Sequence, residues 1–455
     1  MSSPPSHRFR ANWLAWTVER PDRTFRVYVV EPRNYAPRKH ASIFRAALDP
    51  FLTSPEPEYL LDDERSRTAQ PIASRHFDLL TFPEAFLPSD ALLDFLRSVG
   101  DSPPTFGCVH TGLRPPGLAS PAQSHLFKPS DLRELLTELA DIANLWREDL
   151  THFDLWLGEQ QPGDRFNLGC LFTVDSDRRI RLCLHPKLVR SRFEESPSHD
   201  AHMTEANLLS LVTLIPADTS LSRLTIQPLI CSDALWLPTD STNNQPIEAV
   251  NQHRTCFVSP YSDQVDVVSL ATLTPNTMSR LDGHPRLHWH QQFRKAFERA
   301  TTDDGCRRHK QAVFVLSNYR QFSQDRLGGL SGVYIPLSTS ETQYRGPLVA
   351  RTMALYGYFR ENSVDSPVMD PDRWIDVDEL GHEREKTAVR GHIVALNPDA
   401  CRDLADATMF GLTIHRLPSD ADLSQSSDRA LALVVEDTSS SQSARARLQF
   451  APWGA

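Results

Sequence analysis

The chain has 455 residues, a formal net charge of -10 and 40% hydrophobic residues, enough to build a substantial core. The negative charge argues against direct binding to a phosphate backbone, so contact with nucleic acid is expected only through a partner protein. No run approaches the roughly 18 apolar residues of a membrane helix, so no membrane partner is expected. Seven cysteines without a CxxC pair predict free thiols in a reducing, cytoplasmic compartment.

The first hundred residues predict alternating strands and helices. Two apolar stretches within residues 11–31 flank a polar ERPDR turn, which indicates a hairpin or a strand with an early insertion. Residues 42–52 place apolar side chains on one helical face, and Pro50 is expected to end that helix. A strand then leads to Glu84, followed by a helix from about Ser89. This order of elements is typical of an α/β unit.

The middle of the chain predicts a loop, a helix and two hairpins. Residues 100–128 are rich in Pro, Gly and Ser and are predicted to form an active-site loop insertion. An apolar stripe from Leu132 to Trp146 predicts an amphipathic helix. Residues 167–187 and 207–230 each contain two apolar stretches around a polar turn. The second hairpin ends directly before Cys231.

Three chemically distinct groups follow predicted strands: the carboxylate of Glu84, the ammonium of Lys187 and the thiol of Cys231. Together they could supply a base, a positive charge and a nucleophile. Each also has an ordinary interpretation. A cysteine at a strand end is commonly a small buried apolar residue, Glu84 could cap the next helix, and Lys187 could be a solvated turn residue.

The motifs around these residues, in their order along the chain, resemble the carbon-nitrogen hydrolase (nitrilase) superfamily. They are FPEAF around Glu84, NLGCLFTVDSDRRIRLCLHPK ending at Lys187, and ICSD around Cys231. Glu194 lies seven residues after Lys187, where the family commonly has a second Glu. Later segments resemble the family's closing strand, helix and hairpin, at 265–277, 288–300 and 311–336. Leu235 stands where the family often has Arg.

The resemblance implies a fold and a domain division. The fold is a four-layer αββα sandwich. The carbon-nitrogen hydrolase domain spans residues 1–400, with loop insertions at about 100–128, 240–262 and 337–390. Residues 401–455 are expected to form a C-terminal appendage.

The resemblance also implies hydrolysis of a non-peptide carbon-nitrogen bond in a small-molecule amide, carbamoyl compound or nitrile, through a thioester or thioimidate. Cys231 would be the nucleophile, activated as a thiolate by the nearby ammonium, and Glu84 would be the general base and then the general acid. Lys187 and the backbone N–H of Ser232 would stabilise the tetrahedral intermediate. Glu194 would orient Lys187 or the attacking water.

Substrate binding is expected to involve Ser232 and Asn318. No cofactor or metal is expected, and the histidines near residue 288 are interpreted as surface residues.

Assembly is predicted from three large apolar residues just past the nucleophile. Leu235, Trp236 and Leu237 cannot all face one core, so a homodimer or larger homo-oligomer is expected, with Trp236 near the contact. The alternative is that residues 241–260 fold back over Trp236. The resemblance leaves a second function open, a nitrilase-like assembly or regulatory subunit, for example one linked to a reverse transcriptase in antiviral defence.

Overall fold

The computed structural model is of mixed α and β structure, with two main sheets and few helices among the residues that it describes. The described residues are 10–21, 25–32, 35–52, 76–99, 106–117, 125–191, 194, 202–234, 265–273, 280–281, 284–285, 313–319, 321–323, 326–327, 331–334, 389–394 and 407–414. Their helices are α1 (Pro37–Leu52), α2 (Ser89–Ser98), α3 (Pro129–Ala140) and α4 (Thr151–Gly158), with 3-10 turns at Arg147–Leu150 and Cys231–Ala234.

One sheet has six strands in the order β1-β8-β9-β10-β13-β16. The strands are β1 (Arg10–Val18), β8 (Leu208–Pro216), β9 (Leu224–Ile230), β10 (Val267–Ala271), β13 (Val313–Ser317) and β16 (Gly332–Tyr334). β8 and β9 form the predicted hairpin, and β10 lies parallel to both β9 and β13. The end of β9, where Cys231 follows, lies beside the end of β10, because Ile230 pairs with Ala271.

The other sheet has eight strands, seven of them in the order β17-β18-β2-β3-β5-β6-β7, with β4 pairing with β5. The strands are β17 (Val389–Val394), β18 (Ala407–Ile414), β2 (Phe25–Pro32), β3 (Leu79–Thr81), β4 (Leu87–Pro88), β5 (Phe106–Arg114), β6 (Leu168–Val174) and β7 (Ile180–Pro186). β6 and β7 form the hairpin predicted at 167–187. Two short ladders pair β11 (Arg280–Leu281) with β12 (His284–Pro285) and β14 (Gln321–Ser323) with β15 (Arg326–Leu327).

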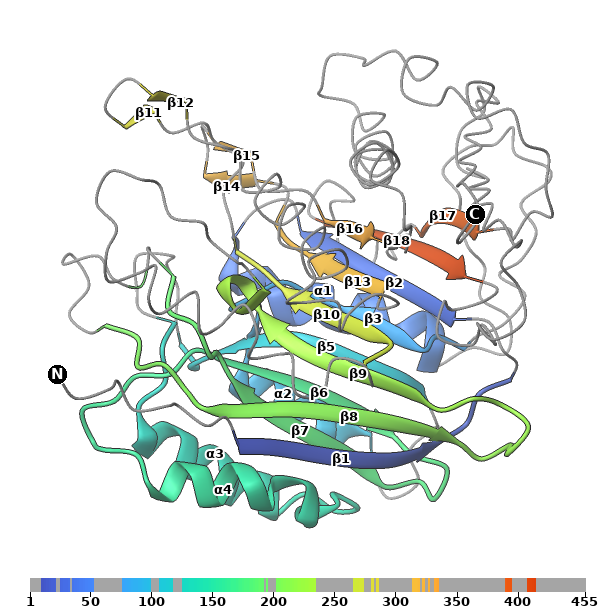
Figure 1. Cartoon of the computed structure of the whole chain (residues 1–455), viewed down its shortest axis with the longest axis horizontal. Coiled ribbons are helices and arrows are strands. Elements are labelled where there is room, and N and C mark those ends of the chain that lie inside the picture. Colours follow the sequence, from blue (N-terminus) through green and yellow to red (C-terminus); the bar gives the residue numbers. More distant parts are fainter. Residues whose placement is uncertain are drawn as a thin grey trace, which may run out of the picture.

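The two sheets face each other (Figure 1), and hydrogen bonds join them directly. His110 Nδ1 on β5 lies 2.7 Å from Ser269 Oγ on β10, and Ser317 Oγ on β13 donates to the Val30 carbonyl on β2 at 2.7 Å. Because side chains alternate along a strand, every second residue of these strands faces the space between the sheets. Side chains at the strand ends can therefore meet between the two sheets.

The helices pack on the opposite face of the eight-stranded sheet. The ring of Phe44 on α1 lies 5.1 Å from that of Phe82, and the ring of Phe95 on α2 lies 5.9 Å from that of Phe172 on β6. α4 packs against the start of β6 through Trp156, whose ring lies 4.8 Å from that of Phe166. The described residues thus form a helical layer, a sheet and a second sheet in succession.

The outer face of the six-stranded sheet, which points away from the other sheet, differs between its edge and its centre. On β1, Trp13 points away from the other sheet and is 38% exposed. At the centre, the buried side chains that point away from the other sheet include the polar Gln227 and the apolar Leu229, Val268, Leu270, Phe314 and Leu316.

The sequence suggested one loop over residues 100–128, but these residues do not form one. They contain β5, a strand of nine buried residues between β3 and β6. The flanking Pro, Gly and Ser residues obscured this strand, as did its own glycines. A Cβ at Gly112 would lie 2.5 Å from the Glu84 Cα, so the close passage of the Glu84 loop requires glycine there.

Three further expectations near the ends of the chain were wrong. The segment 11–31 is not a hairpin, because β1 and β2 belong to different sheets. Pro50 does not end its helix, since α1 continues to Leu52. Residues 407–414 are not part of an appendage, because β18 pairs with β2 along its whole length. Long-range pairing decided these outcomes, and local composition does not encode it.

Several expectations lie outside the described residues. These are the insertion at 240–262, the apolar residues 235–237, the helix at 288–300 and all of the insertion at 337–390 except residues 389–390, which begin β17.

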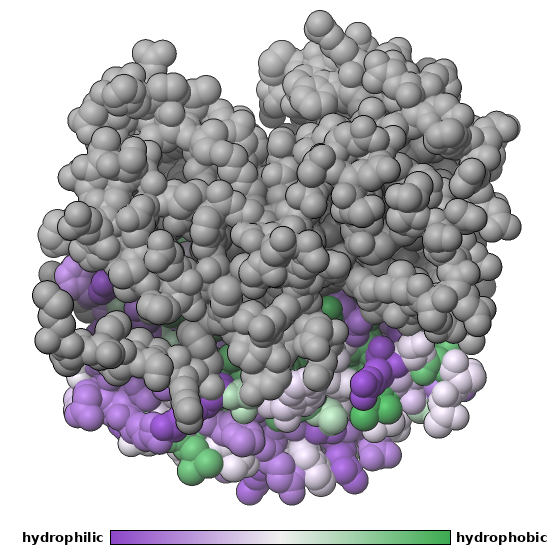
Figure 2. Space-filling view, in the orientation of Figure 1, coloured by the Kyte–Doolittle hydropathy of each residue, from purple (hydrophilic) through white to green (hydrophobic). Residues whose placement is uncertain are grey.

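Within the described part of the chain, no helix is both long enough and apolar enough to cross a membrane. The four cysteines described there, Cys108, Cys170, Cys183 and Cys231, are free thiols, as expected. Figure 2 shows that the described residues on this face are mostly hydrophilic, with scattered apolar side chains.

Candidate active site

Glu84 lies on a tight loop that the neighbouring strands hold on both sides. Its backbone N–H donates to the Thr272 carbonyl at 3.2 Å, and Gly112 N–H donates to the Pro83 carbonyl at 3.0 Å. Ala85 has a φ of +52°, a left-handed conformation that costs energy for a residue with a side chain. The loop is thus held in a strained shape that presents the Glu84 carboxylate between the sheets.

Three buried side chains hold this loop from behind. The Tyr319 hydroxyl donates to the Glu84 carbonyl at 3.1 Å. The Phe86 carbonyl accepts hydrogen bonds from His40 Nδ1 at 2.8 Å and from Arg114 Nε at 3.3 Å. These donors come from α1, β5 and the segment after β13. Elements far apart in the sequence therefore fix the position of Glu84.

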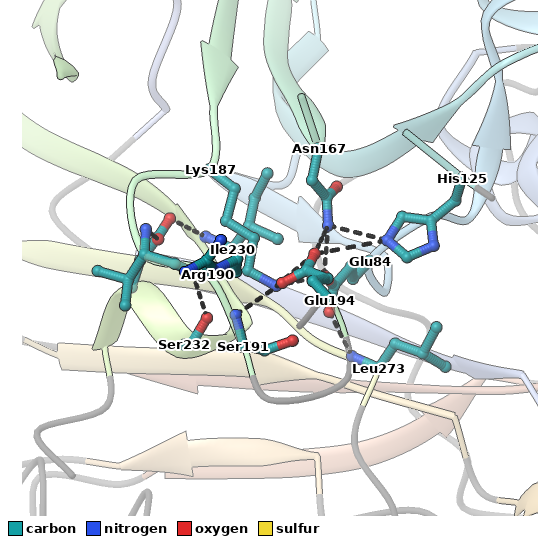
Figure 3. Close-up of polar contacts among 12 residues, drawn as sticks. Glu84, His125, Asn167, Lys187, Arg190, Ser191, Glu194, Ile230, Ser232 and Leu273 are labelled. Atoms are coloured by element: carbon teal, nitrogen blue, oxygen red, sulfur yellow. Dashed lines mark hydrogen bonds and ion pairs between the residues drawn. The ribbon is translucent and has the colours of Figure 1, made fainter. Parts of the chain in front are cut away.

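Lys187 follows β7 and lies between two carboxylates (Figure 3). Its Nζ lies 2.8 Å from Glu84 Oε1, and 3.1 and 2.9 Å from the two oxygens of Glu194. All three residues are at most 5% exposed. A buried charge is stable only when it is paired and hydrogen-bonded, and here each charge has such partners.

Asn167, at the start of the β6 hairpin, bridges the same carboxylates. Its Nδ2 donates to Glu84 Oε1 at 2.6 Å and to Glu194 Oε1 at 3.0 Å. Its backbone carbonyl accepts a hydrogen bond from the Lys187 backbone N–H at 2.8 Å. Asn167 therefore fixes both the lysine backbone and the two carboxylates that the lysine contacts.

Cys231 is the first residue after β9 and is 4% exposed. Its φ of +44° is again left-handed, so the thiol lies on a sharp turn out of the strand. The Leu273 backbone N–H, just past β10, donates to Glu84 Oε2 at 3.0 Å. The same N–H acts as a hydrogen-bond donor that lowers the pKa of Cys231. The thiol and the Glu84 carboxylate are therefore neighbours through one shared amide.

Asp233 ties the Cys231 turn to the segment after Lys187. Its Oδ1 accepts the N–H groups of Leu188 and Val189, both at 2.8 Å, and its Oδ2 accepts that of Ile230 at 3.0 Å. Burial raises the pKa of Asp233 to about 7, although these amides and Lys187 favour its charged form. This contact gives the last residue of the ICSD motif a structural role.

The charge states of the cluster follow from burial and pairing. Burial by itself would lower the pKa of Lys187, but the carboxylates of Glu194 and Glu84 outweigh it and raise that pKa well above its usual value. Burial would raise the pKa of Glu194, but Lys187, with help from His125 and Asn167, lowers it. An ammonium and an ionised Glu194 are therefore the resting forms at neutral pH.

The thiol differs from the sequence-based expectation that the ammonium favours a thiolate. Burial and the Glu84 carboxylate raise the pKa of Cys231 well above its usual value, and Lys187 opposes them only in part. Cys231 is therefore a neutral thiol at rest. A thiol in this state could act as a nucleophile only with a base beside it to accept its proton.

Ser232 and Asn318, the two expected substrate-binding residues, both lie buried at strand ends. Ser232 Oγ donates to the Val189 carbonyl at 2.5 Å. Asn318 Oδ1 accepts the Tyr319 N–H at 2.9 Å. Both side chains thus help to hold the backbone of the site. Contact between either residue and a substrate stays a prediction.

Sequence reasoning missed His125, which lies in the segment expected to be a loop insertion. Its Nε2 lies 3.1 Å from Asn167 Nδ2 and 3.6 Å from Glu194 Oε1. Glu84, His125 and Glu194 offer donor atoms within 4.8 Å of one another, a spacing that could hold a metal ion. Lys187 Nζ already supplies positive charge to both carboxylates. A histidine in a polar segment gives no sequence signal of this contact.

No protein-family model matches the chain, and no curated protein is similar to it. The functional conclusion therefore depends on the geometry of the site.

Proposed function

We propose that the chain hydrolyses a non-peptide carbon-nitrogen bond in a small-molecule amide, carbamoyl compound or nitrile. One observation carries the proposal. A thiol, a carboxylate and an ammonium meet in one buried site, where Lys187 Nζ lies 2.8 Å from Glu84 Oε1 and the Leu273 amide is shared by Glu84 and Cys231. This set supplies a nucleophile, a base and a positive charge, the groups that acyl transfer needs.

In the first half of the reaction, Cys231 Sγ attacks the amide carbon while Glu84 takes the thiol proton. The carbonyl oxygen gains negative charge, which Lys187 and the Ser232 backbone N–H stabilise. The carbon-nitrogen bond then breaks, and Glu84 returns the proton to the leaving nitrogen. The products of this half are an amine or ammonia and a thioester on Cys231. A nitrile would give a thioimidate instead.

In the second half, water attacks the thioester carbon and Glu84 accepts a proton from that water. The carbon-sulfur bond breaks, and the sulfur recovers its proton as the carboxylic acid leaves. Glu194 either orients Lys187 throughout or helps to orient the water. Its bonds to Lys187, at 3.1 and 2.9 Å, support the first role.

The neutral thiol supports general-base catalysis by Glu84. A preformed thiolate would need no proton acceptor, whereas a thiol whose pKa is raised needs one within hydrogen-bond reach. The carboxylate is held for this task by Asn167, Lys187 and the Leu273 amide. A fixed base in a water-poor site also loses little energy to reorganisation.

The finer fold assignment also belongs to this proposal. We propose that the helical layer and the two sheets belong to a four-layer αββα sandwich. The buried apolar side chains on the outer face of the six-stranded sheet support this arrangement, because a second helical layer would cover them.

The alternative is an assembly or regulatory subunit without catalysis. Such a subunit would not need a thiol, a carboxylate and an ammonium together in one site. Burying charged groups is costly, and an assembly module gains no contact from Glu84, Lys187 and Glu194. The geometry therefore favours the enzyme.

Release of ammonia from a panel of amides, carbamoyl compounds and nitriles tests the proposal. Cys231→Ala is expected to abolish release from any compound that the native protein hydrolyses. Cys170→Ala is the matched control, since Cys170 is also a buried free thiol but lies on β6 away from the cluster. An unchanged rate in Cys231→Ala would rule out the mechanism.

A further inference from the structure

Both side-chain N–H hydrogens of Asn167 point to carboxylates, so neither is left to donate to His125. The side-chain amide of Asn167 carries two N–H hydrogens. Glu84 Oε1 at 2.6 Å and Glu194 Oε1 at 3.0 Å use both of them. His125 Nε2 lies 3.1 Å from the same nitrogen, so its lone pair finds no donor there. With both amide hydrogens directed at carboxylates, Nε2 of the imidazole can carry a hydrogen of its own.

A hydrogen on His125 Nε2 would face the Glu194 carboxylate. Glu194 Oε1 lies 3.6 Å away, and Figure 3 shows the ring turned toward this carboxylate with its other nitrogen pointing away from the cluster. Among its effects on Glu194, His125 stabilises the charged carboxylate, after the larger effect of Lys187. His125 thus acts on Glu194 as a donor from the side opposite the buried lysine.

Glu194 is consequently held by four donors. Its Oε2 accepts the Ser191 N–H at 2.8 Å and Lys187 Nζ at 2.9 Å, while its Oε1 faces Asn167, Lys187 and His125. A carboxylate that loses one donor binds its remaining cation more strongly. Without His125, Glu194 would draw the Lys187 ammonium away from Glu84 and the thiol.

His125 also lies on the open side of the cluster. Its side chain is 22% exposed, whereas those of Lys187 and Glu194 are 1% and 4% exposed. The ring therefore separates the carboxylate pair from solvent. Removing it would admit water, which weakens the electrostatic interactions inside.

We propose that His125 is a positioning residue for the nucleophile and its ammonium partner, acting through an Nε2–H hydrogen bond to Glu194. The inference rests on the proposed function, because it assigns His125 a part in the same reaction. The proposal also assigns the hydrogen bond to Nε2 of His125 and not to Nδ1. The amide nitrogen of glutamine can replace Nε2 of histidine, whereas that of asparagine reaches only the place of Nδ1.

Three variants separate these roles: His125→Gln, His125→Asn and His125→Leu. For a compound that the native protein hydrolyses, His125→Leu and His125→Asn are expected to lower kcat about tenfold or more, with KM little changed. His125→Gln should keep kcat close to native.

A second measurement does not depend on turnover. The rate of Cys231 alkylation by iodoacetamide is followed by peptide mass spectrometry across pH, in the native protein and the three variants. His125→Leu and His125→Asn should shift this profile to higher pH, and His125→Gln should not. Equal profiles in all four proteins would overturn the assignment of His125. If no compound releases ammonia, the proposed function fails, while the alkylation profiles still decide the role of His125.

Discussion

Tyr319 donates a hydrogen bond to the backbone carbonyl of Glu84 at 3.1 Å, although 235 residues separate the two in the chain. The bond joins the segment after β13 in one sheet to the loop after β3 in the other. It holds the backbone of the proposed base without touching its carboxylate. The position of Glu84 therefore depends on the packing of the two sheets.

Tyr319→Phe should reduce activity more than its effect on stability suggests. The change leaves a buried carbonyl without this donor, which costs about 1–3 kcal/mol of stability. It also frees the strained loop at Ala85, so kcat should fall about tenfold or more through misplacement of Glu84. Tyr28→Phe is the control, because Tyr28 is equally buried but packs against α1. Equal kcat in both variants would argue against a positioning role.

Lys187→Met should destabilise the protein and abolish turnover. Removing one partner of a buried ion pair costs about 3–5 kcal/mol, because Glu84 and Glu194 would then face each other without a cation. The double variant Lys187→Met with Glu194→Gln should recover most of the stability and none of the activity. Urea unfolding and ammonia release measure the two effects separately.

Arg97→Met is the control for this pair of variants. Arg97 also forms an ion pair, with Glu138 at 2.9 Å, but both side chains are more than 40% exposed. Its loss should change stability by less than about 1 kcal/mol. A Lys187→Met protein as stable as Arg97→Met would contradict the buried, paired state of Lys187.

The sequence predicted the chemical part of the site better than its supports. Glu84, Lys187 and Glu194 do meet. Glu84 and Lys187 each follow a strand with a clear apolar pattern, whereas Glu194 was expected only from its distance from Lys187 in the family resemblance. The shared amide of Leu273 was not predictable, since a backbone N–H has no sequence signature. His125 was missed because the segment before it reads as a loop. β5 was missed because its glycines, required by close packing, suggested a turn.

Two buried histidines between the sheets should make the protein sensitive to acid. Burial lowers the pKa of His110 well below its usual value, and that of His185 to about 3. Both bind a proton near pH 6.5 when unfolded, so their contribution to stability is present above that pH and is lost as pH falls toward 3. Each contributes up to about 1.4 kcal/mol per pH unit to this loss.

Asp233 changes the stability of the protein with pH in the direction opposite to the two histidines. The contribution of the histidines is therefore measured by comparing variants. The raised pKa of Asp233, about 7, makes folding more favourable as pH falls and offsets about one histidine. His185→Gln should therefore flatten the loss of stability between pH 6.5 and 4.5, measured by urea unfolding. His152→Gln, at an exposed position, should leave the slope unchanged. An unaltered slope in His185→Gln would show that the pair is not the cause.

The predicted homo-oligomer can be tested directly on the purified protein. Light scattering at micromolar concentration should give at least twice the mass of one chain, which is 51.4 kDa. Trp236→Ser should shift the protein toward monomer, because a large apolar residue would leave the contact. A native protein of single-chain mass would end this prediction.

The most direct test of the central claim is to trap the covalent intermediate during turnover. Acid quenching of a reaction with a hydrolysed amide should yield a Cys231 peptide heavier by the acyl group of that substrate, and added hydroxylamine should intercept the thioester as a hydroxamate. Ammonia release with an unmodified Cys231 peptide and no hydroxamate would contradict the proposed mechanism.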